Sequence, residues 1–568
     1  MKFSAQAVAS ALCLSTTVFG APAADTPEKR FSQVKVSYPE GSVIGNAGLI
    51  ADSFKGIPFA KPPVGDLRLR PPQRLSGKAE NVDGTKLVAP ACPQMYVSNE
   101  SHDILSKLLT GVLSLPLLDK LNGQEDCLTL DIQRPAGTKA GDKLPVVFWI
   151  FGGAFHLGGS NTYDATSLLT EAVGNNQPFV FVAINYRVGG FGFLGGKEIL
   201  KDGAANLGLL DQRMAMEWVA DNIDAFGGDP SKVTLWGESA GAISIFDQFM
   251  LYGGNATYKG KDLFRAGIMD SGSAVPAEPV DSSKPQAIYD TVVARSGCAG
   301  SSDTLACLRK APYDVFYKAA TSVPGALSYN SVALSYLPRP DGKTLPANPL
   351  VAAKSGKFKK VPVIIGDQED EGTLFSLFQN NVTTTNDIVS YLKDLFFPRT
   401  DVSILREIVN VYPEDISAGS PFRTGIFNEL YPGFKRLAAL LGDITFTITR
   451  RVTLRLVHEI DPTFKAWSYL SSYDYGTPIL GTFHASDILQ AFYGVLPNNA
   501  SRSIRAYYFN FVYNLDPNKG YPVDNWPEWG PSRTLMWFKS AFSNSLLKDD
   551  FRKDAEDVIY KYREDIAI

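Results

Sequence analysis

The chain has 568 residues, of which 45% are hydrophobic and 11% aromatic, enough to build the large core of a globular protein. Its formal net charge is −4. No basic run carries the interleaved aromatic residues typical of single-strand binders, so we expect no nucleic-acid partner.

The N-terminus has the pattern of a secretory signal. A basic start at Met1-Lys2 precedes an apolar stretch, Ala5 to Phe19, which is too short to span a bilayer. We predict a signal peptide over residues 1–20, and a possible short propeptide over 21–30. Its last pair, Lys29-Arg30, is either a dibasic processing site or a solvated charge pair. No later apolar run reaches about 18 residues, so we expect a soluble protein secreted to the extracellular space.

The cysteines agree with secretion, because disulfides persist in oxidising compartments. Cys13 falls in the signal, and four cysteines remain, which allow three pairings. The simplest pairing is sequential, Cys92–Cys127 and Cys298–Cys307. Four N-glycosylation acceptors also occur, at Asn99, Asn255, Asn381 and Asn499.

Short apolar runs that alternate with helical patterns predict a large α/β domain over residues 31–568. The predicted buried strands are Val146–Ile150, Phe179–Ile184, Val233–Trp236, Ala266–Met269, Val361–Ile365 and Phe464–Leu470, and the clearest helix is Met214–Phe226. Such runs suit a mostly parallel sheet covered on both faces. In such sheets, functional residues collect at the carboxyl ends of the strands.

The most informative motif is Gly-x-Ser-x-Gly at Gly237–Gly241. It follows the strand Val233–Trp236 and precedes a helical run from Ala242 to Met250. A sharp strand-to-helix turn presents a serine hydroxyl as a nucleophile, so Ser239 is the candidate nucleophile. The alternative is a plain tight turn whose glycines supply positive φ angles.

A serine nucleophile needs a histidine base, and the chain has four histidines: His102, His156, His458 and His484. In the order nucleophile, acid, histidine, the base follows Ser239. His458 lies in an amphipathic helical run, Arg450–Ile460, where packing is the simpler role. His484 lies in a loop after a predicted strand, so we predict that His484 is the base.

The acid is expected after a strand between the nucleophile and the base. The segment after Val361–Ile365 carries four carboxylates, Asp367, Glu369, Asp370 and Glu371. Either one of them turns inward to orient the histidine, or the segment is a solvated acidic turn. The residues alone do not choose among the four.

An oxyanion hole requires two or three backbone N–H groups. Ala240, directly after the candidate nucleophile, supplies one. The loop Gly152-Gly153-Ala154, which follows the strand Val146–Ile150, is the expected source of the others. The alternative is that its glycines only make a turn.

These motifs resemble those of the type-B carboxylesterase/lipase family, which has the α/β-hydrolase fold and includes cholinesterases, fungal lipases and sterol esterases. The segment Phe226–Gly241 matches the family's active-serine signature, and Glu125–Leu130 matches its second signature. The resemblance extends from about Val36 to the C-terminus.

The resemblance implies specific roles for individual residues. The family's acid is a glutamate followed by Gly-Thr, which is Glu371 here, and its base corresponds to His484. Its oxyanion donors correspond to Gly153, Ala154 and Ala240; many members have a third glycine where this chain has Ala154. The family's disulfides imply the same sequential pairing. No cofactor or metal is expected, since the histidines lack the spacing of metal ligands and the cysteines form disulfides.

The disulfide-closed loop 92–127 resembles the mobile lid of the fungal lipases. Leucines recur at helical spacing in His102–Leu121, a pattern that is also typical of plain core packing. With the lid, the resemblance implies a secreted serine esterase that hydrolyses lipid esters, triacylglycerols or steryl esters, at a lipid–water interface. The alternatives are a carboxylesterase for small soluble esters and a cholinesterase-like adhesion or binding protein. The sequence leaves monomer and homodimer open.

Overall fold

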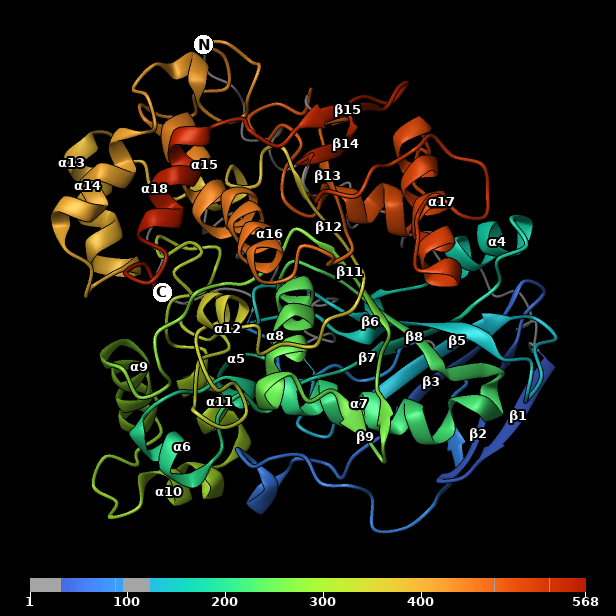
Figure 1. Ribbon diagram of the computed structural model, residues 1–568. Helices are drawn as coiled ribbons and strands as arrows, with labels where there is room; N and C mark the ends of the chain where they lie inside the picture. Colours follow the sequence, from blue (N-terminus) through green and yellow to red (C-terminus); the bar gives the residue numbers. More distant parts are fainter. Residues whose placement is uncertain (1–31, 87, 96–122, 475, 531) are drawn as a thin grey trace, which may run out of the picture.

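The computed structural model describes residues 32–86, 88–95, 123–474, 476–530 and 532–568 (Figure 1). The predicted signal peptide, the predicted propeptide, Asn99 and most of the predicted lid loop lie outside the described residues.

One large sheet of thirteen strands organises the fold. Its order is β1-β2-β3-β5-β7-β6-β8-β11-β12-β13-β14-β15, and β4 pairs with β2. The strands are β1 (Ser32–Tyr38), β2 (Gly41–Ala47), β3 (Ala51–Pro58), β4 (Ala79–Asp83), β5 (Thr129–Pro135), β6 (Leu144–Ile150), β7 (Val180–Ile184), β8 (Gly228–Glu238), β11 (Ala266–Asp270), β12 (Val363–Gln368), β13 (Ala466–Ser471), β14 (Thr534–Phe538) and β15 (Ser545–Lys548); β9 (Thr257–Tyr258) and β10 (Lys261–Asp262) form a separate pair. From β7 to β14 neighbouring strands are parallel, and the outer pairs β1–β2 and β14–β15 are antiparallel.

Helices cover the sheet (Figure 1). They are α4 (Thr166–Gly174), α5 (Gly189–Gly192), α6 (Lys197–Asp202), α7 (Leu207–Asn222), α8 (Ala240–Gly254), α9 (Ser283–Arg295), α10 (Thr304–Lys310), α11 (Tyr313–Ala320), α12 (Pro349–Ser355), α13 (Thr385–Tyr391), α14 (Val402–Asn410), α15 (Phe434–Gly442), α16 (Ile448–Ile460), α17 (Asn499–Asn514) and α18 (Lys553–Lys561). In Figure 1, α4 and α17 lie on one side of the central strands, and α7 and α8 on the other. The predicted α/β fold with a covered, mostly parallel sheet is therefore confirmed.

The six predicted strands coincide with β6, β7, β8, β11, β12 and β13, but their ends differ. Strand β12 continues to Gln368, so Asp367 lies within a strand and not in the loop after it. The predicted helix Met214–Phe226 begins earlier, at Leu207 in α7, and its last turn is a 3-10 segment, η3 (Ile223–Phe226).

Strand β5 has no apolar run, although every one of its residues is buried. Its polar side chains are paired inside the protein: Arg134 Nε lies 3.2 Å from Asp52 Oδ2 in β3, and Asp131 accepts a hydrogen bond from the Gly56 N–H at 2.7 Å. Buried polar groups are tolerated when they are paired in this way. This explains why hydrophobic patterning missed a central strand.

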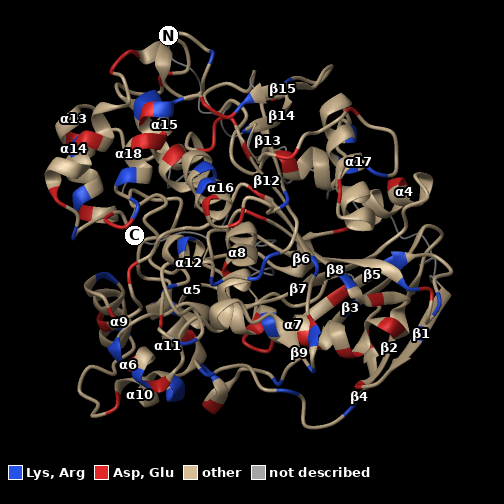
Figure 2. Cartoon of the chain, in the orientation of Figure 1, with Lys and Arg blue, Asp and Glu red and all other residues tan. Residues whose placement is uncertain are grey.

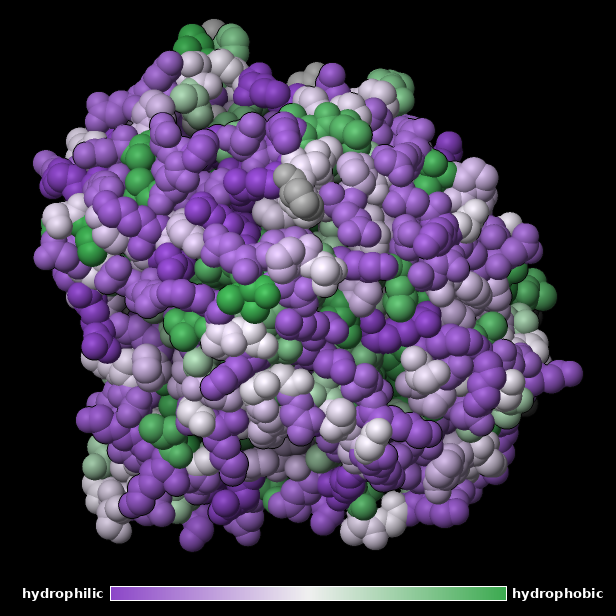
Figure 3. Space-filling model, in the orientation of Figure 1, coloured by the Kyte–Doolittle hydropathy of each residue, from purple (hydrophilic) through white to green (hydrophobic). Residues whose placement is uncertain are grey.

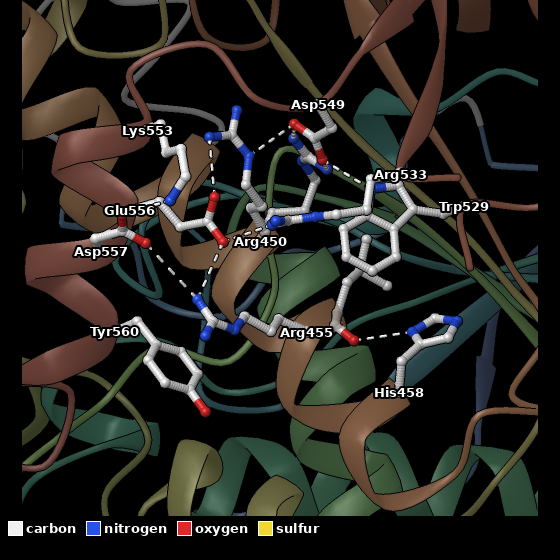
Figure 4. Close-up of polar contacts among 12 residues, drawn as sticks. Arg450, Arg455, His458, Trp529, Arg533, Asp549, Lys553, Glu556, Asp557 and Tyr560 are labelled. Carbon is white, nitrogen blue, oxygen red and sulfur yellow. Dashed lines mark hydrogen bonds and ion pairs between the residues drawn. The ribbon is translucent and has the colours of Figure 1, made fainter. Parts of the chain in front are cut away.

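A buried ionic network fixes α16 against the sheet, and Figure 4 shows its part around Arg450 and Asp549. Arg450 Nε lies 2.5 Å from Asp367 Oδ2, and Arg450 Nη1 lies 2.8 Å from Asp549 Oδ2 beyond β15. All three side chains are fully buried. The network therefore anchors the carboxyl end of β12, which is followed directly by the other three carboxylates of the predicted acidic segment, Glu369, Asp370 and Glu371.

Charged residues of both signs are interspersed over the elements in Figure 2. On the face shown in Figure 3, hydrophobic residues form small, separate groups among hydrophilic ones. None of the helices in the described part of the chain has the length and apolar character that a bilayer crossing demands.

Candidate active site

Ser239 occupies a sharp turn between β8 and α8. Its φ and ψ are 54° and −124°, a backbone conformation that is costly for a residue with a side chain. Hydrogen bonds on both sides hold the turn: the Ser239 N–H donates to the Asp270 carbonyl at 2.9 Å, and the Ile243 N–H donates to the Ser239 carbonyl at 2.9 Å. Such strain is typical of functional sites, where the surrounding structure over-determines it.

The two glycines of the motif are needed for close approach, not for positive φ, which here belongs to Ser239. A Cβ on Gly241 would come within 2.0 Å of the Ile150 carbonyl oxygen, and one on Gly237 within 2.7 Å of the same atom. The turn thus packs directly against the carboxyl end of β6. The alternative interpretation, in which the glycines supply positive φ, is wrong.

Ser239, His484 and Glu371 form a continuous hydrogen-bonded chain. His484 Nε2 lies 2.8 Å from Ser239 Oγ, and His484 Nδ1 lies 2.5 Å from Glu371 Oε2. A carboxylate only accepts, so Nδ1 carries the proton and Nε2 is free to accept from the serine hydroxyl. The rings of Phe375 and Phe446 flank the imidazole, with centroids 5.1 and 4.5 Å away.

The four carboxylates of the acidic segment have four different partners. Asp367 pairs with Arg450, as described above, and Glu369 pairs with Arg423 at the surface, with Arg423 Nε 2.9 Å from Glu369 Oε1. Asp370 accepts hydrogen bonds from the Ser420 hydroxyl and the Thr482 N–H, at 2.8 and 2.9 Å. The segment is therefore not a solvated acidic turn, and of the four carboxylates Glu371 is the one that meets His484.

The loops that carry Glu371 and His484 follow neighbouring parallel strands, β12 and β13. Glu371 is held by its second oxygen, since Oε1 accepts a hydrogen bond from the Gln368 N–H at 2.7 Å. Further, Asp370 and Phe483 form a bridge between the two loops. Both side chains are consequently fixed before any substrate binds.

Two other histidines take no part in this chain of hydrogen bonds. His458 lies in α16, where its Nδ1–H donates to the Leu454 carbonyl at 2.8 Å (Figure 4). His156 follows the glycine-rich loop, and burial lowers its pKa to about 4. Its ring nitrogens have no hydrogen-bond partner in the described part of the chain. His102 lies outside the described residues.

The glycine-rich loop after β6 touches the serine turn. A Cβ on Gly152 would lie 2.9 Å from Ser239 Cβ, which shows how closely the two segments approach. Gly153 and Ala154 both have positive φ, 102° and 56°. Ala154, Ala240 and Ser239 line the same cavity.

A second acidic group that the sequence motifs did not point to, Glu238, lies at the site directly before the serine. Its Oε1 lies 3.4 Å from His484 Nε2. Burial, and then the nearby carboxyls of Asp487, Glu371 and Asp270, raise the pKa of Glu238 well above its usual value. Burial and these carboxyls therefore favour the neutral form of Glu238, which adds no second negative charge beside the histidine. In the sequence, a glutamate at the first variable position of the Gly-x-Ser-x-Gly motif is the feature that could have indicated this group.

The cavity in front of Ser239 is mostly apolar. The space in it that a water-sized molecule can occupy is about 40 Å³, and its walls come from seven separate segments of the chain. The lining residues are Ala154, Phe155, Ser239, Ala240, Ile243, Asp247, Val275, Val332, Leu334, Leu337, Pro338, Phe375, Thr445, Phe446 and Ile568. A cavity with this lining suits a hydrocarbon chain next to the reacting group.

The structure contains both expected disulfides. Cys92 bonds to Cys127, and Cys298 to Cys307, closing sequence separations of 35 and 9 residues.

Three of the four predicted N-glycosylation acceptors, Asn255, Asn381 and Asn499, are exposed.

Comparison with known proteins identifies the family. Residues 31–554 match the family described as the carboxylesterase family. The secreted triacylglycerol lipase LIP1 of Gibberella zeae is 60% identical over 540 residues, covering 95% of this chain and 92% of that protein. Secreted lipase 1 of Botryotinia fuckeliana is 54% identical, covering 93% of this chain and 92% of that protein.

A solved structure agrees. The crystal structure of Aspergillus niger EstA has a TM-score of 0.77 and 25% identity, and the match covers 94% of this chain and 99% of that one. The predicted enzyme class and secretion are confirmed: the chain is a secreted carboxylic ester hydrolase. It belongs to the carboxylesterase family.

Proposed function

We propose that the protein hydrolyses lipid esters through an acyl-enzyme on Ser239. The observation that carries this proposal is the hydrogen-bonded chain from Ser239 through His484 to Glu371. His484 takes the proton of the serine hydroxyl as Oγ attacks the ester carbonyl carbon. The imidazolium then donates that proton to the alkoxy oxygen, and the C–O bond to the alcohol breaks.

Water completes the cycle on the acyl-enzyme. His484 Nε2 takes a proton from the water, whose oxygen attacks the acyl carbon, and then returns the proton to Ser239 Oγ as the acid leaves. Glu371 stays ionised throughout, holds the Nδ1–H tautomer and stabilises the imidazolium. Its fixed position, with Oε1 bonded to the Gln368 N–H, supports that role.

The tetrahedral intermediate carries a negative oxygen, which backbone N–H groups are suited to stabilise. We assign this role to the N–H groups of Gly153, Ala154 and Ala240. Supporting observations are the contact of the glycine-rich loop with the serine turn and the place of Ala240 at the N-terminus of α8. The missing third glycine is no obstacle, since the donor is a backbone group and Ala154 already has the positive φ of a glycine position.

The proposed substrates are long-chain esters, triacylglycerols or steryl esters. The apolar cavity supports this choice, and relatives at 60% and 54% identity are named as a triacylglycerol lipase and a lipase. We propose further that residues 31–568 are one catalytic domain, and that loop 92–127 is a lid that moves at a lipid–water interface. The lid rests on its leucine spacing and its disulfide, since residues 96–122 lie outside the described residues.

A hydrolysis panel tests the proposal: a soluble butyrate ester, a long-chain triacylglycerol emulsion and a cholesteryl ester. We expect the long-chain esters to be hydrolysed with the higher kcat/KM. Hydrolysis of the butyrate ester alone would instead indicate a carboxylesterase for small esters. The lid is tested by activity measured across the solubility limit of one ester: equal specific activity on dissolved and aggregated ester would contradict it.

A further inference from the structure

One face of α8 forms part of the cavity in front of Ser239. Ala240, Ile243 and Asp247 line the cavity and recur at spacings of three and four residues, which places them on one side of the helix. Two of these are apolar, as the rest of the cavity leads one to expect. The third is an acid, and only 2% of its surface is exposed.

The Asp247 carboxyl has no hydrogen bond or ion pair within the described residues, and it lies in the wall of an apolar cavity. Burial raises its pKa well above the usual value. Burial therefore favours the neutral carboxylic acid, which has one O–H donor and an acceptor oxygen. Buried polar groups almost always have partners, so an unpartnered acid at a cavity wall requires an explanation.

A second polar group lines the same cavity from a different segment. Thr445 lies in the π-helical turn η7 (Asp443–Thr447), and its hydroxyl is buried without a hydrogen-bond partner in the described part of the chain. The lining residues with polar side chains are Ser239, Asp247 and Thr445, and the others are apolar. Two unpartnered polar groups in one apolar cavity suggest that a ligand completes their hydrogen bonds.

We propose that this cavity is a subsite for acyl chains that carry a hydroxyl group, and that Asp247 is the residue that selects them. The proposal rests on the proposed function, because it places the acyl chain of the ester in this cavity. Asp247 donates to the chain hydroxyl or accepts from it, and Thr445 supplies a second polar contact.

The position of Asp247 indicates where the hydroxyl lies on the chain. Seven residues separate Ala240 from Asp247, which corresponds to roughly 10 Å along a helix. The hydroxyl therefore lies toward the middle of a long acyl chain and not beside the ester. A charged substituent is disfavoured, because the remaining walls are apolar and an ion would lose its hydration there.

The discriminating experiment compares a stearate ester with its mid-chain hydroxystearate counterpart. We expect the wild-type protein to have the higher kcat/KM for the hydroxylated ester, since a site built to bond a hydroxyl rejects an analogue that lacks it. Asp247→Leu removes both hydrogen-bonding atoms at similar size and should lower the ratio of the two kcat/KM values about tenfold or more.

Two further variants keep the test decisive if Asp247→Leu does not fold. Asp247→Asn retains a donor and an acceptor and should keep most of the preference. Thr445→Val removes a hydroxyl at constant shape and should lower the ratio in the same direction as Asp247→Leu, by a smaller factor. The proposal would be overturned if Asp247→Leu kept the wild-type ratio of the two kcat/KM values. It would also be overturned if the wild-type ratio were one and Thr445→Val left it unchanged.

A butyrate ester separates this inference from the proposed function. Its acyl chain is too short to reach Asp247, so its turnover reports on Ser239, His484 and Glu371 in each variant. No turnover of any ester by the wild-type protein would refute the proposed function. Turnover of all three esters, with the same hydroxystearate-to-stearate ratio in every protein, would refute the subsite alone.

Discussion

His484 and Glu371 lie 113 residues apart in the chain, yet His484 Nδ1 is 2.5 Å from Glu371 Oε2. The parallel pairing of β12 with β13 brings their loops together at the carboxyl edge of the sheet. The contact has a direct chemical consequence, because it determines which imidazole nitrogen faces Ser239.

Replacing Glu371 tests that consequence. Glu371→Gln keeps the shape but can stabilise the wrong tautomer and no longer offsets the imidazolium charge, so kcat should fall roughly 10³–10⁴-fold. Steady-state hydrolysis of a butyrate ester measures it. The matched control is Glu369→Gln, two residues away and paired with Arg423 at the surface, which should remain active. Similar losses in the two variants would contradict the assigned role.

The serine turn depends on a glycine that touches β6. A Cβ at Gly241 would lie 2.0 Å from the Ile150 carbonyl oxygen, so Gly241→Ala must displace backbone. We expect a loss of stability of about 1–3 kcal/mol or more, together with a loss of activity because Ser239 shifts. Thermal unfolding and butyrate hydrolysis report the two effects.

Gly174 at the end of α4 provides the control for this substitution. A Cβ there meets nothing within 4 Å, so Gly174→Ala should be neutral or slightly stabilising. Wild-type stability and activity in Gly241→Ala would show that the turn tolerates a side chain and that the close packing is not required.

The buried pairing of Arg450 with Asp367 and Asp549 predicts a large effect on stability. Arg450→Met leaves Asp367 without its buried cation, which should cost about 3–5 kcal/mol. Arg455→Met, on the same helix α16 but partly exposed, should cost at most about 1 kcal/mol. Chemical denaturation compares the two variants, and equal midpoints would contradict the predicted difference.

Asp247 should make stability depend on pH. Its folded pKa is raised by burial, whereas in the unfolded chain it is about 3.9. The folded protein therefore binds the proton more tightly, and its stability falls as the pH rises above about 4, by up to about 1.4 kcal/mol per pH unit. Asp247→Asn removes this titrating group, so the fall in stability above about pH 4 should be less steep than in the wild-type protein. Unfolding measured at several pH values tests this.

Asp401 serves as a control of opposite sign. This exposed acid caps α14, where hydrogen bonds from Ser403 lower its pKa. Its contribution is present at neutral pH and is lost as the pH falls. Asp401→Asn should therefore lower stability at neutral pH, and the difference from the wild-type protein should shrink as the pH falls below about 4. A wild-type slope in Asp247→Asn would show that this carboxyl titrates normally in the folded protein.

The sequence predicts the parts of the site that are local in the chain. The strand, the glycines and the helix around Ser239 lie within one short segment, and the scarcity of histidines points to His484 by elimination. Strands that are continuous apolar runs, such as β6 and β7, are visible for the same reason, since burial on both faces leaves a local pattern.

The remaining features depend on partners that are distant in the chain. Arg450 and Arg423 pair with Asp367 and Glu369, so neither of these carboxylates is available to His484. The spacing of the residues in the sequence does not reveal these pairs. The acid at Asp247 is unremarkable within the apolar helix α8 until segments up to Ile568 close a cavity against it. Strand β5 is hidden because its polar side chains are paired internally.

The nucleophilic role of Ser239 is tested most directly by covalent labelling with a fluorophosphonate, followed by mass spectrometry of the digested protein. One label per chain is expected, on the peptide that contains Ser239. The label should be absent from Ser239→Ala and present in Ser273→Ala, a variant of another buried serine. Labelling at a different residue, or labelling that persists in Ser239→Ala, would show that Ser239 is not the nucleophile.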